Sequence, residues 1–290
     1  MPVKRVENPP PILRRAPATH KGTYGRVLIV AGSPRMPGAA VLATRAALRG
    51  GAGLVTAAIP ASLSGVLASA VPEATQLLLP EPGAARYKSA LLGALERHPL
   101  SGFDAMAVGP GLDESWPGSS TLLETLIGEF SGPQVLDADA LNIIAARAKG
   151  IPTPQPGRIW TPHPGEFKRL TGESPAEDAE RVAASKRFVQ PGEVVVLKGH
   201  RTVVVEGERY YINETGNPGM ATGGSGDVLT GILAALLGQG YQPFDGACLG
   251  VYLHGTAGDL AAAVLGETSL IAGDITEYLP QAVRKHEDES

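Results

Sequence analysis

The amino-acid sequence predicts an α/β protein in which helices cover both faces of a mostly parallel central sheet. Seven short runs rich in Val, Ile, Leu and Ala recur along the chain, and segments with helical periodicity separate them. Strands that are continuously apolar, without polar alternation, are typical of sheets buried on both faces. Helical crossovers between such strands favour a parallel arrangement.

The predicted elements follow one another in a regular order. Strands are expected at 26–31, 54–59, 75–79, 105–108, 134–136, 158–160 and 194–198. Helices are expected between them at 38–49, 63–70, 88–97, 119–130, 140–147 and 175–189. Residues 202–205 and 209–212, separated by Glu206-Gly207-Glu208, indicate a β-hairpin. Three helices, at 225–237, 244–264 and 273–285, complete the predicted fold.

The chain is interpreted as a single domain spanning residues 1–290. Length alone permits one large α/β domain or two small ones. The Pro-rich stretch 151–157 is the strongest linker candidate, but predicted strands continue on both sides of it. It is therefore expected to be a loop within one domain.

Composition and charge narrow the class of protein. The net charge of -4 gives no basic stripe, so nucleic acid is not an expected partner. The only cysteine, Cys248, excludes an intramolecular disulfide and fits a reducing cytoplasm. Residues 1–15 contain no apolar segment of the signal-peptide kind, and no stretch is expected to span a membrane.

The segment 217–227, Asn-Pro-Gly-Met-Ala-Thr-Gly-Gly-Ser-Gly-Asp, is the most informative in the chain. Small residues let backbone N–H groups converge on a phosphate, and a helix starting near Ser225 adds its positive amino end. A carboxylate at Asp227, beside such an anion cradle, indicates a base. The alternative is a plain N-cap, in which Ser225 or Asp227 starts a core helix.

Ligands of parallel α/β sheets bind beyond the carboxyl ends of the strands, so the loops there are candidate site segments. Five of them carry glycines or polar side chains: 31–40, 108–112, 137–142, 161–166 and 198–202. Each also has a structural interpretation. Asp137 and Asp139 can cap a helix at Ala140, His163 can hydrogen-bond its own turn, and 198–201 can be a solvated hairpin shoulder.

Several familiar chemistries are excluded. The sequence has no P-loop motif, no G-x-G-x-x-G after the first strand and no H-E-x-x-H, and its six histidines do not fall at metal-ligand spacing. No strand leads directly into Gly224-Ser225-Gly226, as the nucleophile elbow of a serine hydrolase requires.

The chain resembles the ribokinase-like superfamily and, within it, most closely the ADP-dependent NAD(P)H-hydrate dehydratases. The resemblance rests on residues 20–25, 31–40, 48–54, 108–112, 137–142, 161–166, 198–202 and 217–227, which span nearly the whole chain. It implies a ribokinase-like three-layer α/β/α sandwich. It also implies repair of hydrated NADH or NADPH: the C6 hydroxyl is phosphorylated, and phosphate is then eliminated.

The resemblance implies a role for each candidate residue. Asp227 would be the general base, and the N–H groups of Gly223, Gly224, Ser225 and Gly226 would stabilise the transferring group. The nucleotide would contact Lys198, Gly199, His200, Arg201 and Thr202, with Gly226 near its phosphate. The hydrated dinucleotide would contact Ala40, Gly111, His163 and Asp227. Glu166 would hold magnesium through water, and Asp137 and Asn142 would assist it.

The same resemblance implies the partners. The expected phosphoryl donor is ADP, with ATP as the alternative, and Mg²⁺ is the expected cofactor. A homotetramer is expected, and since the chain has no room for a fused epimerase domain, a separate NAD(P)H-hydrate epimerase is the expected functional partner. Two other functions stay open. One is a ribokinase-like kinase acting on a hydroxymethylpyrimidine, a thiazole alcohol or a sugar, and the other is a non-catalytic nucleotide-binding module.

Overall fold

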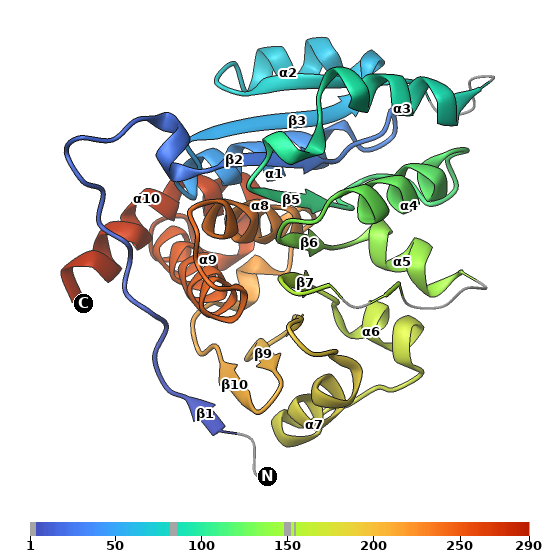
Figure 1. Cartoon of the computed structure of the whole chain (residues 1–290). Coiled ribbons are helices and arrows are strands. Elements are labelled where there is room, and N and C mark those ends of the chain that lie inside the picture. Colours follow the sequence, from blue (N-terminus) through green and yellow to red (C-terminus); the bar gives the residue numbers. More distant parts are fainter. Residues whose placement is uncertain (1–3, 82–85, 148–151, 154, 290) are drawn as a thin grey trace.

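The computed structural model describes residues 4–81, 86–147, 152–153 and 155–289. Within these residues, ten strands form one sheet in the order β1-β10-β9-β8-β7-β6-β5-β2-β3-β4. Helices lie on both faces of this sheet (Figure 1). The predicted α/β class with three layers is therefore confirmed.

The strands agree closely with the predicted runs. They are β1 (Lys4–Val6), β2 (Arg26–Val30), β3 (Leu54–Pro60), β4 (Thr75–Leu79), β5 (Ala105–Val108), β6 (Gln134–Leu136), β7 (Arg158–Trp160), β8 (Val194–Leu197), β9 (Val203–Glu206) and β10 (Arg209–Ile212). Strand β9 is antiparallel to both of its neighbours, β8 and β10, and the other adjacent pairs are parallel. The sheet is thus mostly parallel, and the predicted hairpin is its antiparallel part.

One face of the sheet packs against α1 (Pro37–Arg49), α2 (Ser64–Ala70), α8 (Ser225–Gly238) and α9 (Pro243–Leu265), while α10 (Ala272–Glu289) packs on α8 and α9. The other face packs against α3 (Tyr87–Arg97), α4 (Ser119–Glu129), α5 (Asp139–Ala145), α6 (Pro164–Thr171) and α7 (Asp178–Phe188). Short 3₁₀ helices occur at Lys21–Tyr24, Ala61–Leu63, Leu100–Gly102, Pro218–Met220 and Glu267–Ser269. Two separate apolar cores result, one on each side of the sheet.

Two elements lie where the sequence predicted none. Strand β1 has only three residues, Lys-Arg-Val, and it forms by pairing in parallel with Arg209–Tyr211 of β10. Helix α6 begins with Pro164-Gly165 inside a segment expected to be a loop. The Pro-rich stretch 151–157 lies partly outside the described residues, so its prediction as a loop is not tested there.

Helix α9 is long and apolar enough to span a membrane, although no such stretch was expected from the sequence. Its 23 residues have a mean hydropathy of 1.3 in their most apolar window, which is enough by length and composition to cross a membrane. However, 56% of that window is buried inside the protein, where α9 packs on α8 and α10. Core helices of globular proteins pass the same test, and the packing of α9 is that of a core helix.

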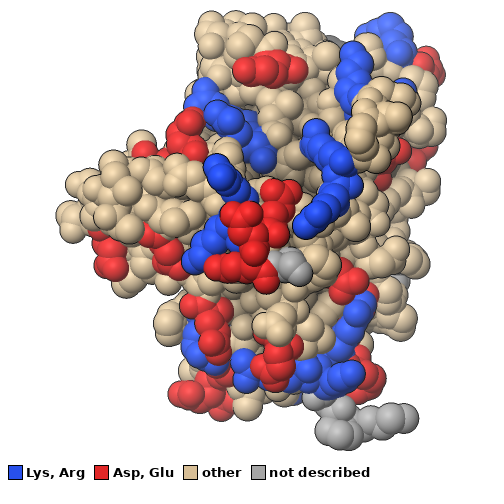
Figure 2. Space-filling view, turned by 90° about the vertical axis from the view of Figure 1, so that its left-hand side faces the viewer, with Lys and Arg blue, Asp and Glu red and all other residues tan. Residues whose placement is uncertain are grey.

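On the side of the molecule that carries the amino-terminal segment, side chains of both charges lie next to one another (Figure 2). On this face, Lys and Arg side chains are interspersed with Asp and Glu side chains (Figure 2). This pattern agrees with the nearly balanced charge of the chain. The candidate site lies where the carboxyl ends of the neighbouring strands β2, β5, β6, β7 and β8 meet.

Candidate active site

Helix α8 begins with a glycine turn. Gly224 is its N-cap residue, in the left-handed region with φ 91°, and no side chain caps the helix. This left-handed conformation favours glycine, and a Cβ atom at this position would lie 2.4 Å from Cδ1 of Leu42 on α1, whose side chain would have to move. The N–H groups of Gly226 and Asp227, in the first helical turn, have no intrahelical acceptor. The interpretation of Ser225 or Asp227 as a plain N-cap is therefore wrong.

Asp227 lies in the first turn of α8, next to these N–H groups. Burial, together with the carboxylate of Asp137, raises the pKa of Asp227 to about 7 against the opposing effect of Lys198. A carboxyl group that titrates near neutral pH is suited to take up a proton during a reaction. This geometry is consistent with the predicted role of Asp227 as a base, which stays a prediction.

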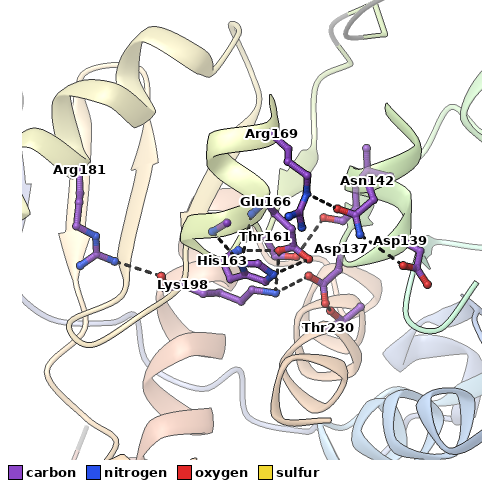
Figure 3. A network of polar contacts seen from close by, with 12 residues as sticks. Asp137, Asp139, Asn142, Thr161, His163, Glu166, Arg169, Arg181, Lys198 and Thr230 are labelled. Atoms are coloured by element: carbon purple, nitrogen blue, oxygen red, sulfur yellow. Dashed lines mark hydrogen bonds and ion pairs between the residues drawn. The ribbon is translucent and has the colours of Figure 1, made fainter. Parts of the chain in front are cut away.

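The ammonium group of Lys198 lies among carboxylates (Figure 3). Its Nζ is 2.6 Å from Oδ1 of Asp137 and 3.8 Å from Oε2 of Glu166. A Cβ atom built on Gly226 would be 3.4 Å from this Nζ, so the charge lies against the start of α8. Burial alone lowers the pKa of Lys198, but the carboxylates raise it above the ordinary value. Lys198 is therefore a fixed cation at the glycine turn, and its interpretation as a solvated hairpin shoulder is wrong.

Asp137 is held on both of its carboxylate oxygens. Oδ1 accepts the hydrogen bond from Lys198, and Oδ2 accepts one of 2.6 Å from Oγ1 of Thr230 on α8. Its side chain is 1% exposed, and it follows β6 directly. Asp137 therefore joins the end of β6 to α8 and β8, and it does not cap α5, whose N-cap is Ala138.

His163 and Glu166 form a reciprocal cap at the start of α6. The ring Nδ1 of His163 accepts hydrogen bonds of 2.9 Å and 3.3 Å from the N–H groups of Gly165 and Glu166, and Oε2 of Glu166 accepts one of 2.7 Å from the N–H of His163. Burial lowers the pKa of His163, and Lys198 and Arg169 lower it further. The neutral form of the ring is thus favoured at pH 7. Its Nε2 lies 3.4 Å from Oε1 of Glu166, on a side chain that is 49% exposed.

Asn142 and Asp139, in the first turn of α5, are the remaining polar side chains near Asp137 and Glu166. Oδ1 of Asn142 accepts a hydrogen bond of 2.9 Å from Nε of Arg169, while Oδ2 of Asp139 accepts one of 2.8 Å from the N–H of Asp113. These contacts connect α5 to α6 and to the turn after β5. Asn142 is therefore engaged by an arginine in addition to lying near the carboxylates.

The residues present suit a hydrated magnesium ion. Among the residues that the structure describes, no group of three or more His, Cys, Asp or Glu side chains can hold a metal ion directly. Burial raises the pKa of Glu166 to about 7, an effect that Lys198 reduces and Asp137 enhances. Since Mg²⁺ commonly keeps several waters and binds through one or two carboxylates plus substrate phosphates, Glu166 fits it as an outer ligand. Both oxygens of Asp137 already accept hydrogen bonds, so the assisting role expected of Asp137 does not fit this arrangement.

Ala40 and Gly111 lie together at the opposite end of the site. Ala40 is 2% exposed and packs against Gly32, whose N–H donates a hydrogen bond of 2.8 Å to the carbonyl of Pro110. Gly111 packs against Met36 and Ala39. The start of α1 and the turns after β2 and β5 thus pack into one surface, which we call the backbone-lined subsite. Its role in dinucleotide binding stays a prediction.

The loop 198–202 follows β8. Its Gly199 and His200 are exposed, while Arg201 is half-buried and adopts φ 56°. Nε of Arg201 is 2.8 Å from Oδ2 of Asp178, and its guanidinium is 3.2 Å from Oε1 of Glu214. The Arg201 side chain is thus turned toward these carboxylates, and the hydroxyl group of Thr202 donates a hydrogen bond of 3.0 Å to the carbonyl of Gly199. The predicted role of this loop in nucleotide binding stays a prediction.

Sequence reasoning missed three side chains of the site. Thr230 contacts Asp137, Arg181 contacts the loop 198–202, and Nε2 of His254 lies 3.0 Å from the carbonyl oxygen of Ser225. Burial lowers the pKa of His254 to about 4, so this imidazole is neutral and supports the helix start as a hydrogen-bond donor. Of the three, only Thr230 could have been found from the sequence, because it lies three residues after Asp227 and therefore on the same face of the predicted helix.

A parallel sheet, a glycine-rich helix start and a carboxylate beside it define the ribokinase-like class of α/β proteins. The family model described as NAD(P)H-hydrate dehydratase matches residues 27–281, and the chain belongs to this family. This assignment confirms the family resemblance found in the sequence.

Two curated relatives illustrate the match. The chain is 46% identical to the bifunctional NAD(P)H-hydrate repair enzyme Nnr of Moorella thermoacetica, over 95% of this chain and 52% of that protein. It is 38% identical to the ADP-dependent (S)-NAD(P)H-hydrate dehydratase of Neisseria meningitidis, over 90% of this chain and 86% of that protein. The chain thus spans about half the length of the bifunctional relatives that it matches.

Solved structures agree with this assignment. The ADP/ATP-dependent NAD(P)H-hydrate dehydratase of Bacillus subtilis, co-crystallised with ATP and Mg²⁺, has 30% sequence identity and a TM-score of 0.78, and the match covers 96% of this chain and 95% of that one. A ribokinase-like superfamily protein of Enterococcus faecalis has 27% identity and a TM-score of 0.80, covering 95% and 92%. Both cover nearly the whole sheet and its helices.

Proposed function

We propose that this protein is an ADP-dependent (S)-NAD(P)H-hydrate dehydratase that returns hydrated NADH and NADPH to the reduced dinucleotides. The observation that carries this proposal is Asp227, a half-buried carboxyl group with a raised pKa beside the N–H groups of the α8 start. A site of this kind binds a phosphoryl group and removes a proton next to it. The family assignment supplies the substrate class.

Asp227 takes the proton of the C6 hydroxyl group while the hydroxyl oxygen attacks the terminal phosphorus of ADP. The new O–P bond forms as the bond to the AMP oxygen breaks. Proton transfer of this kind typically contributes ~10²–10⁴-fold to a rate. A carboxylate with a pKa of about 7 is a stronger base than an ordinary aspartate, and about half of it is ionised at neutral pH.

The start of α8 stabilises the transferring group. Its free N–H groups and the positive end of the helix dipole face an anion, and the fixed ammonium of Lys198 lies against Gly226. Phosphate is a better leaving group than hydroxide. The lone pair of the ring nitrogen then expels phosphate, and loss of a proton from C5 forms the C5–C6 double bond.

The two substrates occupy opposite sides of Asp227. The backbone-lined subsite of Ala40 and Gly111, with the edge of His163, receives the hydrated dinucleotide, and loop 198–202 receives the nucleotide. Glu166 would hold hydrated Mg²⁺ through water, and the ion would screen the negative charge of the phosphates. ADP is proposed as the donor because the Neisseria relative, matched over 86% of its length, is named for it.

The proposal is tested by incubating the purified protein with hydrated NADH, Mg²⁺ and either ADP or ATP. Recovery of NADH absorbance together with AMP and free phosphate is expected with ADP. A stable phosphomonoester without NADH would identify a small-molecule kinase instead. Nucleotide binding without any phosphate release would identify a binding module, and faster turnover with ATP would correct the donor.

A further inference from the structure

Arg181, on α7, is a buried arginine outside every predicted role. The residue is 6% exposed, and its side chain forms an ion pair with Asp178 at 3.5 Å. Most of its hydrogen bonds go to backbone carbonyl groups (Figure 3 shows the one to Lys198). Burying a cationic side chain against neutral carbonyls is costly unless those contacts are specific, which makes their location informative.

The guanidinium group fills the inside of the loop that follows β8. Nη1 donates hydrogen bonds of 2.9 Å to the carbonyls of His200 and Arg201, and Nη2 donates one of 2.8 Å to the carbonyl of Leu197 and a longer one of 3.5 Å to that of Lys198. A Cβ atom at Gly199, where φ is 146°, would lie 3.4 Å from Nη2. The loop is thus wrapped closely around one planar cation.

This arrangement fixes the direction of the loop's N–H groups. In a trans peptide the carbonyl and the next N–H point in opposite directions. Because the carbonyls of Lys198, His200 and Arg201 point at the guanidinium, the N–H groups of Gly199, Arg201 and Thr202 point away from it. Within the described part of the chain, no group accepts a hydrogen bond from the N–H groups of Gly199, His200 or Arg201. Successive N–H groups in a turn form an anion-binding concavity.

We propose that Arg181 is a positioning residue that shapes loop 198–202 into a phosphate-binding turn by drawing its carbonyl groups inward. The ligand is the phosphate chain of a nucleoside diphosphate, bound by backbone N–H groups, with the guanidinium behind them adding positive charge. This inference rests on the proposed function only in taking the loop as the nucleotide site. Asp178 supports the same turn from outside, since it contacts both Arg181 and Arg201.

The test compares Arg181→Ala with Arg187→Ala. Arg187 is a matched control, because it lies on the same helix, is 61% exposed and pairs with Glu173 away from the loop. Calorimetric titration with ADP, without turnover, is expected to give about tenfold weaker binding for R181A and less than about twofold change for R187A. Arg181→Lys, which keeps the charge but not the planar fork, is expected to lie between them.

Two readouts separate positioning from general damage. Millimolar guanidinium ion is expected to restore part of the ADP affinity of R181A and to leave R187A unchanged, because the free ion can occupy the emptied loop. The KM for the hydrated dinucleotide is expected to stay near that of the wild type.

ADP affinity within twofold of the wild type in both R181A and R181K would overturn the inference. So would equal losses of ADP and dinucleotide affinity, because that result would indicate general loss of structure. Where R181A does not fold, R181K is measured in the same way. Failure of the proposed function gives a different result, namely ADP binding that depends on Arg181 with no recovery of NADH.

Discussion

The protein has one buried ion pair at the amino ends of its parallel strands, here called the amino edge, and another at their carboxyl ends, the carboxyl edge. The two are built differently. At the amino edge, Arg158 is 2.9 Å from Glu193, and both side chains are almost inaccessible, at 1% and 2% exposure. Glu193 also accepts hydrogen bonds from Trp160 and from the N–H of Gln155. At the carboxyl edge, Lys198 has Asp137 and Glu166 around it. The four residues of β8 are all that separate Glu193 from Lys198.

The difference lies in charge balance. Arg158 and Glu193 carry opposite charges, and the donors around Glu193 satisfy its oxygens. At the carboxyl edge several carboxyl groups lie around one ammonium group, and burial, together with the repulsion between these carboxylates, raises the pKa values of Glu166 and Asp227 to about 7. Surplus negative charge is unfavourable for stability, and it is useful where a proton must be taken up and a cation or phosphate bound.

The largest expected effect is on turnover. Asp227→Asn removes the base and should lower kcat by ~10²–10⁴-fold while leaving ADP affinity within about twofold. Asp245→Asn is the control, since Asp245 occupies the corresponding first-turn position of α9 at the other edge and should keep full activity. Recovery of NADH absorbance measures both. Normal turnover by D227N would remove Asp227 from the chemistry.

The next effect is on stability at the amino edge. Glu193→Gln leaves the Arg158 guanidinium buried without its counter-charge, and breaking such a pair typically costs about 3–5 kcal/mol. Urea unfolding should show this loss, while kcat per folded molecule stays at the wild-type value. An unchanged unfolding midpoint, or a loss of kcat without loss of stability, would contradict the assignment of this pair to structure alone.

A smaller effect with the opposite sign is expected at the carboxyl edge. The pKa of Asp227 is about 7 in the folded protein against 3.8 ordinarily, so between these values the unfolded chain has already released the proton. Wild-type stability therefore falls as pH rises through this window, and the loss persists above it. The D227N variant carries no titrating group at this position, so it should be more stable than the wild type at pH 8, by on the order of 1–3 kcal/mol, but not at pH 4. Equal pH dependence in thermal melts would refute this.

The smallest effect is on the pH profile. Activity should rise with pH through about 7 as Asp227 loses its proton, and the charge of Asp139 contributes to the raised pKa of Asp227. Asp139→Asn should therefore move the rising limb of kcat/KM to lower pH by less than about one unit. Asp104→Asn, at the amino edge, is the control and should leave the profile in place. A shift of D139N toward higher pH would show that the sign of this coupling is wrong.

Much of the fold could be predicted from the sequence, because continuous apolar runs and helical periodicity are local signals. All seven predicted strands and the hairpin are present. Strand β1 could not be predicted, since three residues without an apolar pattern pair only with Arg209–Tyr211, about two hundred positions away. Helix α6 was hidden by its Pro164-Gly165 start, which is also typical of turns.

The site could be predicted in part. The glycine turn and Asp227 have a recognisable local pattern, and the structure brings the predicted loops to one edge of the sheet. Partner choice is not local. The pairing of Lys198 with Asp137, 61 positions away, was not predicted, and it arises because β6 and β8 end near each other across β7. Arg181 was not predicted, because in sequence it is an ordinary charge on a polar helix.

Strand β1 has a practical consequence. Its Arg5 is 3.4 Å from Glu214, and Glu214 also pairs with Arg201 in the loop after β8. A label or purification tag joined ahead of β1 would thus be connected, through the ion pairs that Arg5 and Arg201 both form with Glu214, to the loop proposed to hold ADP. Affinity measurements are therefore safer with such additions at the opposite terminus.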